Sequence, residues 1–173
     1  ALNTRGYVYL NRGDYDMALN DFNMAIEKDP DDRNSYYARL SYYMIIKDFE
    51  AAIKEAEKTI NMDNDDPQGY YVLADIYNNQ EYNKKSSFKS LNNISLAIDK
   101  LSAAGKDGYY ISDHYGKNRI ELTEILKFRA SLYMAFNEND LMCDDYQTAL
   151  ELTDEGSEDR IEIEKLIAEN CMG

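Results

Sequence analysis

A period of 34 residues constrains this chain more than any other feature. Within its first thirty residues, small and large apolar side chains occupy a fixed series of places: Leu2, Gly6, Tyr9, Tyr15, Ala18, Leu19, Phe22, Ala25, Ile26 and Pro30. A shift of 34 residues carries Gly6 onto Leu40, Tyr9 onto Tyr43, Tyr15 onto Phe49, Ala18 onto Ala52 and Ile26 onto Ile60. A second shift carries Tyr43 onto Tyr77. A repeat of this length is typical of an array of stacked structural units.

The order of these residues resembles the tetratricopeptide repeat, a helix–turn–helix unit of about 34 residues. The resemblance is close over residues 1–80 and looser over 119–155. It implies an all-α, right-handed α-solenoid of tetratricopeptide-like helical hairpins, with an irregular third unit and a C-terminal capping helix. No Gly/Ser/Pro-rich linker interrupts the pattern, so we expect one domain over residues 1–173. Its units are about 1–32, 33–66, 67–117 with an insertion, and 118–156, followed by a cap helix at 157–172.

Apolar spacing, turn residues and prolines predict the individual helices. The expected helices run from the start to Arg12 and over Tyr15–Lys28, Arg33–Ile46, Phe49–Met62 and Pro67–Asn79. The next helix continues to about Ala104, because the third unit holds 22 surplus residues. An irregular, mobile loop that includes Tyr109–Gly116 follows, and we expect the first proteolytic cut between Gly105 and Lys117. Helices over Asn118–Asn137 and Asp140–Thr153 and a last helix capped by Ser157 complete the chain.

Small residues occupy places where two helices of a unit must nearly touch. Gly6, Ala18 and Ala52 fill such places, so we expect each of them at a close helix–helix contact. A larger side chain at these positions is predicted to overpack the hairpin.

The net charge of −14 is unevenly distributed along the chain. Residues 1–82 hold 8 basic and 16 acidic side chains, residues 83–137 hold 9 and 5, and residues 138–173 hold 2 and 12. This balance argues against nucleic acid as a partner, because phosphate binding needs clustered Lys and Arg. No apolar run is long enough for a membrane span. No signal-peptide pattern is visible, which favours a cytoplasmic location, but the chain begins with Ala1 rather than Met, so export stays open.

The chain lacks the motifs that signal an enzyme, a metal centre or a cofactor site. Its one histidine lies in Asp113-His114-Tyr115, where we interpret it as a surface residue. The acidic run Asp63-Asn64-Asp65-Asp66 lacks the glycine and closing glutamate of a calcium loop, so it is interpreted as a turn and helix cap. Cys143 and Cys171 lie in apolar helical patterns, which favours buried free thiols over a pair.

In the family that the chain resembles, the first helix of each unit lines a concave groove that accepts an extended peptide or a partner helix. The residues at the corresponding positions are Asn3, Tyr7, Tyr37, Ser41, Tyr71 and Asp75. The Lys, Asn and Arg set that grips acidic C-terminal tails is missing, and Asp75 would repel such a tail. We therefore expect a neutral or basic peptide or protein as the partner.

Two alternatives stay open at this point. Tyr37 and Tyr71 either line the groove or pack against neighbouring helices, and in the second case binding would move to the basic stretch around Lys84, Lys85 and Lys89. The overall role is either a protein–protein interaction scaffold or a structural spacer within a longer repeat protein, with no ligand of its own. The sequence fixes neither the partner nor the oligomeric state.

Overall fold

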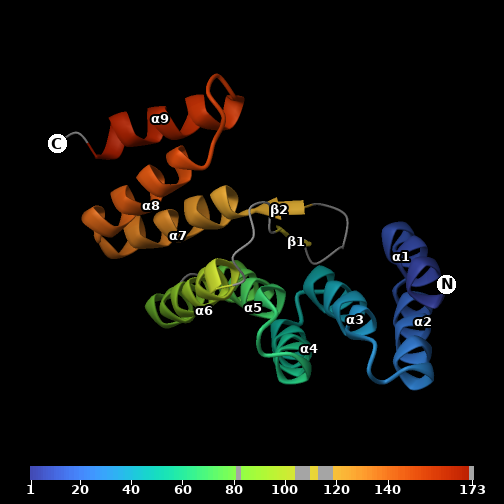
Figure 1. The fold of residues 1–173 in the computed structure, drawn as a ribbon. Coiled ribbons are helices and arrows are strands. Elements are labelled where there is room, and N and C mark those ends of the chain that lie inside the picture. The colour runs from blue at the N-terminus through green and yellow to red at the C-terminus, as the bar shows by residue number, and fades with distance from the viewer. Residues whose placement is uncertain (81–82, 104–109, 113–118, 172–173) are drawn as a thin grey trace.

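The computed structural model describes residues 1–80, 83–103, 110–112 and 119–171. Within these ranges the chain forms nine helices and two short strands (Figure 1). The elements are α1 (Leu2–Arg12), α2 (Tyr15–Lys28), α3 (Arg33–Ile45), α4 (Phe49–Met62), α5 (Pro67–Asn79), α6 (Lys84–Ala103), β1 (Tyr110–Ser112), β2 (Arg119–Glu121), α7 (Leu122–Phe136), α8 (Asn139–Glu151) and α9 (Glu158–Asn170). The first five helices confirm the predicted ones to within one residue.

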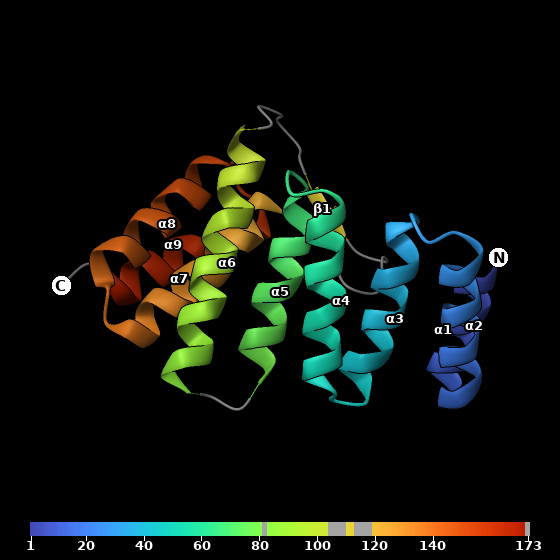
Figure 2. The same cartoon turned by 90° about the horizontal axis from the view of Figure 1, so that it is seen from below.

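The helices form hairpins that stand side by side in one row (Figure 2). The pairs are α1 with α2, α3 with α4, α5 with α6, and α7 with α8. The second helix of each hairpin also packs against the first helix of the next one, and α9 packs against α8 as the cap. This is the predicted all-α, right-handed solenoid of helical hairpins. The two chain ends lie at opposite ends of the row (Figure 1).

Aspartates mark where helices begin, and residues in the left-handed backbone conformation mark where helices end. Asp32, Asp48 and Asp66 cap α3, α4 and α5, and each side chain accepts a hydrogen bond from a backbone N–H of the first turn. Asp66 thereby confirms that the acidic run caps the next helix. The α1–α2 and α3–α4 turns place Gly13 (φ 81°) and Lys47 (φ 60°) at equivalent positions, 34 residues apart.

Small residues allow the paired helices to approach closely, as the sequence predicts. Ala18 and Ala52 have no exposed surface. A Cβ atom added to Gly6 would meet the ring of Phe22, which is itself fully buried. Bulk is therefore excluded at all three positions.

The core is divided into three apolar clusters along the row. One lies among α1, α2 and α3, the second among α3, α4 and α5, and the third among α5 to α9. Tyr43 packs against the first and second clusters, and Tyr71 packs against the second and third. The clusters are thus joined at two half-buried tyrosines.

The insertion in the third unit differs from the prediction. Helix α6 has 20 residues and is longer than the others, as expected. However, β1 and β2 form an antiparallel pair in which Ile111 lies opposite Ile120. The predicted irregular loop is therefore wrong at residues 110–112, and the predicted helix from Asn118 begins at Leu122 instead. The expected mobile loop otherwise falls at 105–109 and 113–117, outside the described residues, as does the Asp113-His114-Tyr115 group.

The cysteines form a disulfide that joins α8 to the end of α9. Cys143 and Cys171 are bonded to each other, so the expectation of two free thiols is wrong. Helical spacing placed both residues on apolar faces but could not show that these faces meet. Among the described residues, no helix has the length and apolar character that crossing a membrane requires.

Candidate binding surface

The six candidate groove residues occupy two equivalent positions on successive first helices. Asn3, Tyr37 and Tyr71 are 34 residues apart, and so are Tyr7, Ser41 and Asp75. The two positions are four residues apart, so they lie on the same side of each helix. The candidates therefore share one face of α1, α3 and α5.

The structure brings the candidates of α1 against α3. Asn3 Nδ2 donates a hydrogen bond to Ser35 Oγ over 3.0 Å. The Tyr7 hydroxyl and Ser41 Oγ form a second hydrogen bond of 3.4 Å. Tyr7 also contacts Phe22 edge to face, with 5.4 Å between the ring centroids. Asn3 and Tyr7 remain half-exposed, so this end of the face is both ordered and accessible.

Tyr37 and Ser41 lie beneath the surface rather than on it. Tyr37 is 6% exposed and belongs to the cluster that contains Val72 and Ile76. Ser41 is fully buried and donates its hydroxyl to the Tyr37 carbonyl over 2.9 Å. Tyr37 therefore packs against neighbouring helices, which is one of the two alternatives that the sequence left open. Neither residue offers an open groove surface.

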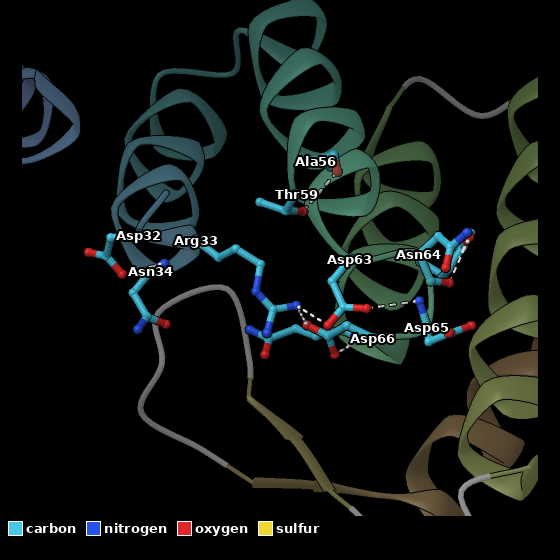
Figure 3. Close-up of polar contacts among 11 residues, drawn as sticks. Asp32, Arg33, Asn34, Ala56, Thr59, Asp63, Asn64, Asp65 and Asp66 are labelled. Carbon is cyan, nitrogen blue, oxygen red and sulfur yellow. Dashed lines mark hydrogen bonds and ion pairs between the residues drawn. The ribbon is translucent and has the colours of Figure 1, made fainter. Parts of the chain in front are cut away.

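Burial also governs the chemistry of the Tyr37 phenol. Its hydroxyl is buried, and the geometry gives it no hydrogen-bond partner among the described residues. Burial raises the pKa of Tyr37, and the hydroxyl of nearby Thr59 opposes that shift only in part. Thr59 donates its own proton to the Ala56 carbonyl over 2.8 Å (Figure 3). Tyr37 therefore stays neutral and serves as a packing residue.

Tyr71 and Asp75 form the part of the face that belongs to α5, and both are half-buried. The Tyr71 ring contacts Phe128 of α7 edge to face, with 6.3 Å between centroids. Asp75 accepts a hydrogen bond from Asn79 Nδ2 over 2.9 Å. Strand β1 lies directly beside α5, and Figure 1 shows the β1–β2 hairpin on the side of the row that carries α1, α3 and α5. The sequence did not predict this neighbour of the candidate face.

Ion pairs hold the helix starts together at one edge of the row (Figure 3). Arg33 Nη1 lies 2.6 Å from Asp66 Oδ2 and 3.2 Å from Asp63 Oδ2, which joins the start of α3 to the start of α5. Lys100 of α6 lies 2.8 Å from Asp65. The acidic run therefore caps a helix, as predicted, and it also forms ion pairs that the sequence analysis did not predict.

Three arginine–carboxylate pairs link the two helices of a hairpin, and sequence analysis missed them. They are Arg5 with Asp21, Arg39 with Glu55 and Arg129 with Asp145. Each pair is separated by 16 residues, and Arg39 follows Arg5 by the repeat length of 34. These two spacings are the signal in the sequence from which the pairs could have been predicted. The hairpin of α5 and α6 has Leu73 and Lys89 at the corresponding positions, so it cannot form the pair.

The alternative basic surface lies on α6. Lys84 and Lys85 are exposed. Lys89 lies over the Tyr77 ring, with its Nζ 4.7 Å from the ring centroid. These cations belong to α6, the second helix of its hairpin, whereas the candidate residues belong to the first helices α1, α3 and α5.

Comparisons with known proteins agree with the fold. Two family models described as the tetratricopeptide repeat match residues 1–32 and 34–66. A search of curated proteins finds no match to the chain. Repeats of this family typically build non-enzymatic scaffolds, which supports a general role in protein–protein interaction.

Solved structures share the architecture at low sequence identity. MamA from Desulfovibrio magneticus RS-1 is 17% identical with a TM-score of 0.63, covering 87% of this chain and 73% of that one. Another crystal structure of MamA is 16% identical with a TM-score of 0.63, covering 95% and 91%. Pseudomonas aeruginosa PilF is 14% identical with a TM-score of 0.68, covering 98% and 67%. At these identities the likeness shows the fold alone. Residues 1–66 therefore hold two tetratricopeptide repeats, and the helical hairpins that follow them continue the same solenoid.

Proposed function

We propose that this protein is an interaction scaffold that binds a peptide or a partner helix along the face shared by α1, α3 and α5. The observation that supports this most is the 3.4 Å hydrogen bond between Tyr7 of α1 and Ser41 of α3. The two residues occupy equivalent positions of the repeat. Their contact makes the face continuous from one hairpin to the next. Asn3, Tyr7, Tyr71 and Asp75 contact the partner in this proposal, while Tyr37 and Ser41 support them from below.

The partner is neutral or basic. Tyrosine offers a large contact area at low conformational cost and a hydroxyl for hydrogen bonding. None of the six candidate positions holds Lys or Arg, and Asp75 supplies a carboxylate. With a net charge of −14, the protein attracts basic partners and repels acidic ones. The same features disfavour nucleic acid as a partner.

Selection of peptides by charge tests this proposal. A random peptide library displayed on phage is selected on the wild-type protein, and the enriched peptides are measured by fluorescence anisotropy. We expect neutral and basic sequences, and we expect the Tyr7→Ala/Tyr71→Ala double variant to bind them about tenfold more weakly or worse. Tyr15→Ala is the matched control, because Tyr15 is a tyrosine of α2 that is 43% exposed.

Circular dichroism melts of each variant separate binding from folding. Enrichment of acidic peptides would contradict the partner chemistry. Equal binding by wild type and the folded double variant would contradict the site. If the protein enriches no peptide and binds none of the basic proteins of its host, this result would favour the spacer role.

A further inference from the structure

The repeat carries the candidate face onto α7, which the sequence analysis did not consider. Arg39 and Arg129 each pair with a carboxylate 16 residues later, so they occupy the same position of the repeat. Tyr37 lies two residues before Arg39, and it is one of the candidate residues. Lys127 lies two residues before Arg129, so it holds the position of Tyr37 on α7, the first helix of its hairpin.

Helix α9 supplies the next equivalent position at Glu162. Tyr37 lies five residues after the N-cap of α3, and Glu162 lies five residues after Ser157, the N-cap of α9. The pattern of burial agrees with this register. The residue that follows is fully buried in both helices, Ala38 in α3 and Ile163 in α9.

The two new positions contact each other between successive helices, as Tyr7 and Ser41 do on α1 and α3. Lys127 Nζ lies 2.7 Å from Glu162 Oε2 and 2.6 Å from Oε1 of Glu124 in the first turn of α7. The Lys127 side chain is 15% exposed, whereas those of Glu124 and Glu162 are 49% and 58% exposed. The ammonium group therefore lies beneath two carboxylates that remain open to solvent.

Charge divides the extended face into two parts. The candidate residues of α1 and α3 are uncharged, and α5 contributes the carboxylate of Asp75. On α7 and α9, one ammonium group stands against two carboxylates, which leaves a net charge of −1. A carboxylate has about four lone-pair sites, so Glu124 and Glu162 can each accept further hydrogen bonds while they hold Lys127.

Building on the proposed function, we propose that α7 and α9 extend the binding face and that Glu124 and Glu162 receive a lysine or arginine side chain of the partner. Lys127 is a positioning residue in this contact, because it holds the two carboxylates of different helices close together. The neutral part of the partner lies on α1 and α3, and its basic part lies on α7 and α9. The face thus selects a partner that is neutral in one part and basic in another.

Fluorescence anisotropy with two peptide probes tests this selection. One probe is a basic peptide enriched on the wild type, and the other is the same peptide with each Lys and Arg replaced by Gln. Glu124→Gln/Glu162→Gln should bind the basic probe about fivefold more weakly, while its affinity for the neutral probe should be unchanged. The difference should shrink in high salt, because the carboxylates are exposed.

Glu164→Gln is the matched control. The Glu164 side chain is 53% exposed and lies 3.1 Å from Arg160, so it resembles Glu162 in exposure and in having a basic partner. Two residues of a helix differ in direction by about 200°, so Glu164 points away from the extended face. This variant should bind both probes as the wild type does.

Lys127→Gln separates the effect of charge from that of structure. It breaks the same link between α7 and α9 but leaves both carboxylates, so it should bind the basic probe about twofold more tightly or better. Equal weakening in Lys127→Gln and in Glu124→Gln/Glu162→Gln would overturn the proposal, because the link would then act through structure alone. If the glutamine double variant binds both probes normally while Tyr7→Ala/Tyr71→Ala does not, this extension is overturned and the proposed function stands. A wild type that enriches no basic peptide would overturn the extension as well.

Discussion

At the scale of single residues, two equivalent ion pairs differ in their electrostatics. Arg5 hydrogen bonds to Asp21 and thereby lowers the pKa of that carboxyl group. In the next hairpin, burial raises the pKa of Glu55, and the charge and hydrogen bonds of Arg39 offset this only in part. At this position of the repeat, the charged form of the carboxyl group is thus favoured in the first hairpin and disfavoured in the second.

The two carboxylates should therefore affect stability oppositely as pH changes. Because the folded pKa of Asp21 is lowered, its contribution is present above the unfolded pKa of about 4 and is lost as pH falls through the folded pKa. The stability gap between wild type and Asp21→Asn should shrink toward acid. Because the folded pKa of Glu55 is raised, its contribution is lost as pH rises through that pKa. Glu55→Gln should therefore gain on the wild type toward neutral pH. Thermal melts from acid to neutral pH measure both gaps, and parallel profiles would contradict this assignment.

Lys47 adopts a left-handed backbone conformation at the place where the first hairpin has Gly13. In this conformation, a residue with a Cβ atom destabilises the folded state by about 1–2 kcal/mol relative to glycine. Glycine loses more backbone entropy on folding, which offsets part of this difference. Lys47→Gly should stabilise the protein by about 0.5–1 kcal/mol in urea denaturation. Asn137→Gly, also at a φ of 60°, is the control and should gain less, because asparagine tolerates this conformation. A loss of stability in Lys47→Gly would show that the lysine side chain matters more than the backbone.

At the scale of helices, the close approach of α1 and α2 depends on Gly6. In an exposed helix, replacing glycine with alanine stabilises by about 1 kcal/mol. Here the new methyl group would meet the fully buried ring of Phe22. Gly6→Ala should therefore destabilise the protein by about 1–3 kcal/mol. Urea denaturation measures the change, and Thr4→Ala in the same helix serves as the exposed control. A stabilised Gly6→Ala would mean that α1 and α2 are farther apart than described.

The disulfide determines how firmly α9 is held. Ile163 is the only fully buried side chain described in α9, and the bond closes a loop between residues separated by 28 positions. Removing such a crosslink costs about 2–4 kcal/mol. In Cys143→Ala/Cys171→Ala, hydrogen exchange of the α9 amides should become much faster, while α1 to α4 should be unchanged. Equal protection of α9 in both proteins would contradict a role for the bond.

Helix prediction succeeded where one face of each helix is apolar and the turns hold Asp, Gly or Pro. It failed at β1 and β2, because strands of three residues are too short for a period, and the helical spacing of Leu122, Ile125 and Leu126 was extended back over Ile120. The six candidate residues lie on α1, α3 and α5, and their contact with a partner stays a prediction. The burial of Tyr37 depends on how closely α3 and α5 approach, and neither that distance nor the meeting of the two cysteines is encoded in local spacing.

At the scale of the whole molecule, each hairpin contacts mainly its neighbours, and the core is divided into three clusters. Stability in such an array is roughly a sum of unit and neighbour contributions. A core change at one end should therefore act locally. Phe22→Leu should cost about 1 kcal/mol and speed hydrogen exchange in α1 to α3 but not in α7 to α9. Ile163→Val, at the other end, should give the reverse pattern, and a uniform change in either variant would mean that the array unfolds as one body.

Tyr43 and Tyr71 each pack against two of these clusters, so the seams between clusters depend on two rings. Shortening either side chain should therefore weaken the contact between two clusters while each hairpin keeps its own pairing. Because Tyr71 is also a candidate partner contact, a partner bound there would act on the boundary between the second and third clusters.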